Sequence, residues 1–102
     1  MARDPYHIAR QEHLGDALDG LQARGYLTWA WDYQGRRAVY WVGEPPGTEP
    51  RSLDTRQAED LVQRHYDALG EPWRPVPHPG GESQRSAVIQ WIANARARRA
   101  SP

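Results

Sequence analysis

Residues 26–43, YLTWAWDYQGRRAVYWVG, place six aromatic residues and two adjacent arginines around Gln34 and Gly35, and this pattern constrains the fold more than any other feature. Alternation with a period of two is typical of β-strands, and a short break containing glycine predicts a hairpin. We place a two-residue turn at Gln34 and Gly35. One face of the hairpin is then almost wholly apolar, and we expect it to be core: Leu27, Trp29, Trp31, Tyr33, Ala38, Tyr40 and Val42.

The opposite face of the hairpin is half polar. Its members are Thr28, Ala30, Asp32, Arg37, Val39 and Trp41. Asp32 and Arg37 are expected to pair across the strands, because opposite charges on facing positions attract. A binding surface is expected on this face and at the arginine-rich turn.

A helix is predicted before the hairpin, over residues 5–24. Asp4 can cap free amides, Pro5 is preorganised for a first helical position, and Gly25 is typical of a left-handed helix end. Gly15 and Gly20 disfavour helix, so we expect a kink or a division near them.

A second helix is predicted over residues 54–69, capped by Asp54 or Thr55 and ending at Gly70. Its apolar stripe consists of Ala58, Leu61, Val62, His65, Tyr66 and Leu69. The sequence RSL just before it, residues 51–53, predicts a short third strand.

Residues 71–82 contain prolines at 72, 75, 77 and 79, which favour an extended strap that Trp73 ties to the domain. A last helix is predicted from Ser83, with Val88, Trp91, Ile92 and Ala95 as its stripe. It docks on residues 1–70 or on a second copy of the chain, which makes a homodimer one expected state. The predicted fold class is α+β: a small antiparallel sheet, formed by the aromatic hairpin and a short third strand, packed by helices.

Composition narrows the function classes. The chain of 102 residues is expected to form one domain, and 13 arginines balance 13 acidic residues with no lysine. Zero cysteines exclude disulfides and thiolate metal sites. No signal peptide or membrane-spanning run is recognisable, so a cytoplasmic protein without membrane association is expected.

No catalytic arrangement is recognisable, and we expect a non-enzymatic protein without metal or cofactor. The four histidines are scattered at positions 7, 13, 65 and 78. His65 is expected to be a packed, hydrogen-bonded residue of the second helix. A catalytic role would need His65 beside Asp67 and a serine in a cleft.

Residues 26–69, with the turn QGRR, the strand RSL and the helix DTRQAEDLVQRHYDAL, resemble the amino-terminal DNA-binding domain of tyrosine recombinases. That resemblance implies a three-stranded sheet that enters duplex DNA, and a small accessory or regulatory protein of a phage or mobile element. The residues it assigns to nucleic acid are Thr28, Arg36, Arg37, Trp41 and Arg51.

Residues 14–43 also resemble part of a winged helix domain. This second resemblance implies that residues 16–24 read the major groove and that Arg36 and Arg37 form the wing tip. Two aspartates in that helix would face phosphates. The order helix, three strands, helix over residues 5–69 is similar to double-stranded RNA-binding domains, but the lysines of their second helix are absent.

Protein recognition is the alternative function, as an inhibitor or adaptor, for example of a host defence or nucleic-acid enzyme. Tryptophan, tyrosine and arginine dominate interface hot spots. The candidates for a protein interface are Arg37, Trp41 and Trp91. The terminal arginines Arg96, Arg98 and Arg99 either complement a helix dipole or add phosphate affinity as a basic tail.

Overall fold

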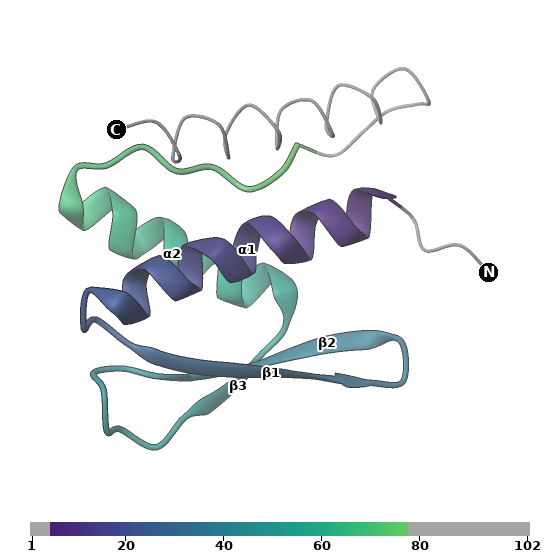
Figure 1. Cartoon of the computed structure of the whole chain (residues 1–102), viewed down its shortest axis with the longest axis horizontal. Coiled ribbons are helices and arrows are strands. Elements are labelled where there is room, and N and C mark those ends of the chain that lie inside the picture. The colour runs from purple at the N-terminus through teal and green to yellow at the C-terminus, as the bar shows by residue number, and fades with distance from the viewer. Residues whose placement is uncertain (1–4, 78–102) are drawn as a thin grey trace. The chain divides into compact units, whose positions relative to one another are not determined.

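The computed structural model describes residues 5–77 of the chain (Figure 1). The elements follow in the order α1 (Pro5–Ala23), β1 (Thr28–Gln34), β2 (Arg37–Gly43), β3 (Arg51–Leu53) and α2 (Thr55–Leu69). Two helices with a three-stranded antiparallel sheet confirm the predicted α+β class. The predicted last helix, with Trp91, Arg96, Arg98 and Arg99, lies outside the described residues, as do Asp4 and positions 78–82.

The chain divides into two compact units. The larger one, Leu14–Arg74, contains the sheet, α2 and the second part of α1. Of the other unit the structure describes residues 5–13 and 75–77, where Tyr6, Ala9 and Val76 form a small buried cluster. Neither described helix has the combination of length and apolarity that a membrane crossing requires.

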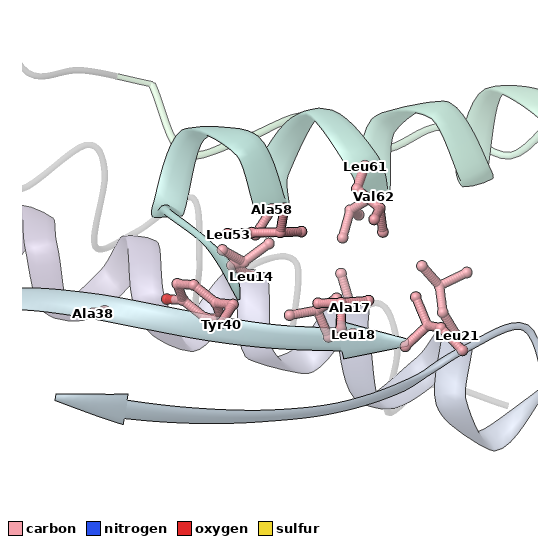
Figure 2. Packing of buried hydrophobic residues seen from close by; sticks show 12 residues of the cluster. Leu14, Ala17, Leu18, Leu21, Ala38, Tyr40, Leu53, Ala58, Leu61 and Val62 are labelled. Carbon is pink, nitrogen blue, oxygen red and sulfur yellow. The ribbon is translucent and has the colours of Figure 1, made fainter. Parts of the chain in front are cut away.

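The core of the larger unit lies between the helices and one face of the sheet (Figure 2). Helix α2 and the second part of α1 both pack on this face, which we call the inner face (Figures 1 and 2). Apolar residues at helical spacing meet alternate residues of β2 and the end of β3. The buried residues are Leu14, Ala17, Leu18, Leu21, Leu27, Ala38, Tyr40, Val42, Leu53, Ala58, Leu61 and Val62.

Helix α1 runs without interruption through Gly15 and Gly20, so the expected division does not occur. Each glycine faces a large ring: a Cβ at Gly15 would lie 3.5 Å from Trp29 Cη2, and one at Gly20 would lie 3.4 Å from the Tyr66 hydroxyl. After the helix, the backbone of Gly25 takes φ +83° as predicted. Glycine reaches this left-handed region without steric cost, and the helix ends there.

Helix α2 begins with a complete capping box. Asp54 accepts a hydrogen bond from the Gln57 backbone N–H at 2.8 Å, and the Gln57 side chain accepts one from the Asp54 N–H at 2.9 Å. Gly70, with φ +70°, ends the helix. The predicted bounds, the Asp54 cap and the short strand over residues 51–53 are therefore confirmed.

The segment after α2 is held to the larger unit at two places. Trp73 packs against the core and stacks on Tyr66, with ring centroids 6.2 Å apart, as predicted for this tryptophan. The Arg24 guanidinium donates to both carboxylate oxygens of Glu71, at 2.8 and 3.0 Å. The hydrogen bond with Glu71 raises the pKa of Arg24 above its ordinary value.

The hairpin turn lies one residue later than predicted. Gln34 faces Arg37, so the two turn residues are Gly35 and Arg36. Gly35 has φ +62° and Arg36 does not have positive φ, which is the combination that a type II′ turn needs. Every cross-strand partner moves by two residues as a result. A shift of two keeps each side chain on its predicted face.

Candidate binding surface

The face of the sheet away from the helices is the candidate binding surface, and we call it the outer face (Figure 1). In the part of the chain that the structure describes, no helix lies over it. The register of the strands assigns to it Thr28, Ala30, Asp32 and Gln34 of β1, Arg37, Val39 and Trp41 of β2, and Ser52 of β3. Thr28, Arg37 and Trp41 therefore share one face, as the sequence predicted.

Trp41 lies at the centre of the outer face. It pairs with Ala30 on one side and with Ser52 on the other, and 37% of its surface is exposed. Its indole Nε1 donates a hydrogen bond to Asp32 Oδ2 at 3.3 Å. This bond holds one edge of the ring on the sheet and leaves the rest of the indole available to a partner.

The predicted pairing of Asp32 with Arg37 is wrong. Because the turn is at Gly35 and Arg36, Asp32 faces Val39 and its carboxylate accepts the Trp41 bond instead. The outer face thus has a carboxylate near its centre, between the tryptophan and the turn.

Arg36 and Arg37 lie at the hairpin tip, and both are exposed. Arg36 is in the turn and Arg37 begins β2 opposite Gln34. No ion pair to either arginine is found among the described residues. Thr28 lies at the opposite end of β1, about 20 Å away along a strand of this length. Thr28, Arg36 and Arg37 are therefore spread along the hairpin rather than gathered at one point.

Arg51 lies on the other side of the sheet from Trp41. It pairs with Val42, whose side chain belongs to the inner face, and its guanidinium Nη2 is 3.5 Å from Glu44 Oε1. Strand alternation explains this placement: Ser52, the next residue, is the member of β3 that faces outward. Arg51 thus belongs to a different surface from the one expected of it.

Glu44 connects Arg51 to His65 of α2. The His65 Nε2 and Glu44 Oε2 are in hydrogen-bonding contact, and both side chains are half-buried. The centroids of the Tyr26 and His65 rings are 6.0 Å apart. His65 is therefore a packed, hydrogen-bonded residue, as predicted, and its partner is Glu44 rather than Asp67.

Asp67 accepts a hydrogen bond from Gln63 Nε2 at 2.9 Å, so it is engaged within its own helix. Among residues 5–77 no three histidine, aspartate or glutamate side chains are grouped as metal ligands would be.

The charge of the larger unit differs from that of the whole chain. Residues 14–74 contain seven arginines and ten acidic residues, whereas the full chain is balanced. The compensating arginines lie outside these residues, mainly near the carboxyl end. Nonspecific phosphate binding depends on positive charge, so the body of this unit is poorly suited to it.

Sequence reasoning missed two features of the surface. Trp31 was expected in the core, yet 49% of it is exposed on the edge strand β1. Tyr33, next to it on the same face, is exposed as well. Both side chains are exposed because an edge strand has a neighbour on one side only. Alternation of residue types does not reveal which strand lies at the edge, so no signal in the sequence indicated this exposure.

Comparison of the chain with models of protein families, with curated proteins and with solved structures finds no match in any of the three.

Proposed function

We propose that this chain is a protein-binding module, an adaptor or inhibitor, whose outer face receives a partner protein around Trp41. The observation that supports this proposal best is the composition of that face. An exposed tryptophan, with Ala30 and Val39 beside it and Asp32 bonded to its indole, is surrounded by polar or amphipathic side chains: Thr28, Gln34, Arg37 and Ser52.

A protein interface commonly has this arrangement. Aromatic residues are enriched at its centre, and its rim is polar and solvated; on the outer face the one central charge, Asp32, already accepts the Trp41 hydrogen bond. Trp41 can bury a large area on binding at a low entropic cost, since Asp32 already restrains the indole. Arg37 at the rim can donate to carboxylates or carbonyls of the partner.

Duplex DNA is the second candidate partner, and the observation in its favour is the pair Arg36 and Arg37 at the exposed tip. A basic hairpin tip can contact phosphates or enter a minor groove. We rank this function lower for two reasons. Asp32 lies on the same face as Trp41, where it would repel phosphates, and the larger unit carries more acidic than basic residues.

The test of the first proposal compares two tryptophans of the same hairpin. The partner is first identified by mass spectrometry of complexes isolated from the organism that encodes the chain, and its affinity is then measured with purified proteins. Trp41→Ala should weaken binding at least tenfold, as expected for a central aromatic residue. Trp31→Ala is the matched control, because Trp31 is similarly exposed but lies on the inner face.

Circular dichroism of both variants should show the wild-type fold. Equal losses of affinity in the two variants would contradict an interface centred on the outer face. Unchanged affinity in Trp41→Ala would do so as well.

The second candidate is tested with a duplex of random sequence at several salt concentrations. Arg36→Ala combined with Arg37→Ala should lower the affinity and reduce the slope of log K against log salt by up to about two. If the wild-type chain binds no duplex at low salt, or binds with a salt-independent affinity, DNA is not its partner.

A further inference from the structure

We propose that β1 pairs with β1 of a second copy of this chain, antiparallel and centred on Trp31, to form a continuous six-stranded sheet. This surface is the sheet edge, so the inference is independent of the function proposed for the outer face. It follows from the position of β1, the direction of its backbone groups and the order of its side chains.

The strand order β1-β2-β3 leaves β1 at an edge. In a hairpin with a two-residue turn, the residues that flank the turn exchange hydrogen bonds, and the pairs then alternate along the strands. Gln34 and Arg37 flank the turn, so the even-numbered residues of β1 bond to β2. The backbone N–H and C=O of Trp31 therefore point away from the sheet.

A side-chain contact supports this assignment. The backbone N–H of Trp29, which is also odd-numbered, donates to Gln22 Oε1 of α1 at 3.0 Å rather than to β2. Gln22 thereby covers the first outward-facing donor of the edge. The donor of Trp31 has no such cover among the described residues, and the residue is 49% exposed.

Apart from the Gln22 contact and the single charge of Asp32, the edge lacks the devices that usually prevent strand addition. Natural edge strands are short, or contain proline, lysine or a bulge. Strand β1 has seven residues, TWAWDYQ, without proline or a basic residue, and pairs with β2 through an uninterrupted register. The other edge, β3, has three residues only.

When two copies of β1 are placed antiparallel, side chains of similar type lie opposite each other. With Trp31 opposite Trp31 of the second copy, Ala30 lies opposite Asp32, Trp29 opposite Tyr33, and Thr28 opposite Gln34. Aromatic residues then meet aromatic residues on one face, and small or polar residues meet on the other. No like charges are opposed. A two-fold symmetric interface uses each such pair twice.

The register is also restricted by charge and by Gln22. Centring the pair on Asp32 would oppose two carboxylates, which is unfavourable on facing positions. Centring it on Ala30 would require the Trp29 N–H that Gln22 holds. Centring it on Trp31 makes the two Trp31 residues the central pair, whose two hydrogen bonds do not involve the Trp29 N–H. In the flanking pairs of Trp29 with Tyr33, the Tyr33 N–H can donate to the Trp29 carbonyl while Gln22 keeps the Trp29 N–H.

The test is sedimentation equilibrium of the full chain over a range of concentrations. We expect a reversible transition from 11.7 kDa to twice that mass, and amide exchange at Trp31 that slows as the dimer forms. A chain that remains at 11.7 kDa up to millimolar concentration overturns the proposal.

Charge substitutions at position 30 test the register. Ala30→Asp places a carboxylate opposite Asp32 twice per dimer and should weaken dimerisation on the order of tenfold. Ala30→Arg should strengthen it. Ala30→Asp combined with Asp32→Ala removes the repulsion and should restore the wild-type dissociation constant.

Trp31→Pro tests the backbone, because it deletes an N–H that β2 does not use. It should abolish the dimer while the circular dichroism spectrum stays unchanged, whereas Trp41→Ala should leave the dimer intact. A dimer that persists unchanged in both Ala30→Asp and Trp31→Pro would lie on another surface and would refute pairing through β1.

Discussion

The two long strands of the hairpin have the same length, and each places every second side chain on the inner face, yet they differ in how deeply these inner residues are buried. Ala38, Tyr40 and Val42 of β2 are all buried, and only 2% of the Tyr40 surface is exposed to solvent. On β1, Trp29 is half-buried and Trp31 is 49% exposed. β2 lies between two strands and under the helices, whereas β1 is at the edge.

This difference shows that a strand sequence predicts which side chains share a face but not how deeply that face is buried. The period of two determines which side chains share a face, because successive Cβ atoms point in opposite directions. The depth of burial depends on what covers that face and on the strand order. Residue type on the inner face reflects the difference. The edge strand has two tryptophans there, whose indole N–H can be bonded in a partly exposed position, and the central strand has alanine, tyrosine and valine.

The largest predicted effect is on β2. Tyr40→Ala removes a ring that packs in the core between α2, α1 and the sheet (Figure 2) and should lower the free energy of unfolding by about 3–5 kcal/mol. Urea denaturation followed by circular dichroism measures this change. Trp31→Ala, at the facing position of β1, should lower it by less than about 1 kcal/mol. Similar losses in the two variants would show that the edge strand is as deeply packed as the central one.

Much of the fold was predictable because its signals are local. The α2 capping box, the glycines that end both helices and the alternation of the hairpin each depend on neighbouring residues. The faces were predicted correctly even with the turn misplaced by one residue. That error moved each partner by two positions, from Asp32 opposite Arg37 to Asp32 opposite Val39, and two positions preserve the face.

The parts that were not predictable depend on pairing between distant residues. The side of the sheet that Arg51 takes is fixed by its register with Val42, and a strand of three residues shows too little alternation to reveal it. The contact between Glu44 and His65 joins residues 21 positions apart, through a loop whose path no local signal specifies. Of the candidate surface, alternation predicted that Thr28, Arg37 and Trp41 share a face, but not the bond from Trp41 to Asp32.

The end of β2 should tolerate even a small addition poorly. A Cβ at Gly43 would lie 2.5 Å from the Thr48 backbone oxygen and 3.2 Å from Thr28 Oγ1, so backbone must move to admit it. Gly43→Ala should therefore destabilise the fold by about 1–3 kcal/mol in thermal or urea unfolding.

Gly15→Ala is the matched control for that substitution. Its Cβ would meet Trp29 Cη2 at an ordinary contact distance of 3.5 Å, within a helix. It should be neutral or stabilising by up to about 1 kcal/mol, because alanine is the better helix former. Destabilisation by both alanines to the same extent would mean that the crowding at Gly43 is not the cause.

The smallest predicted difference lies within β1 and tests whether its two tryptophans are distinct. The Trp29 indole Nε1 donates to Asp19 Oδ1 at 3.0 Å, and its ring stacks on Tyr40 with centroids 6.2 Å apart. Trp29→Phe should lose about 1 kcal/mol, since the hydrogen bond to Asp19 is deleted while most of the ring area remains. Trp31→Phe should change the free energy of unfolding by less than about 0.5 kcal/mol, because no core residue depends on its indole N–H. Urea unfolding of both variants should be measured at concentrations at which the chain is monomeric, so that pairing through β1 does not contribute. A larger loss for Trp31→Phe than for Trp29→Phe would contradict this assignment. It would mean that β1 is held on the domain mainly by Trp31 and not by the contacts of Trp29 with Asp19 and Tyr40.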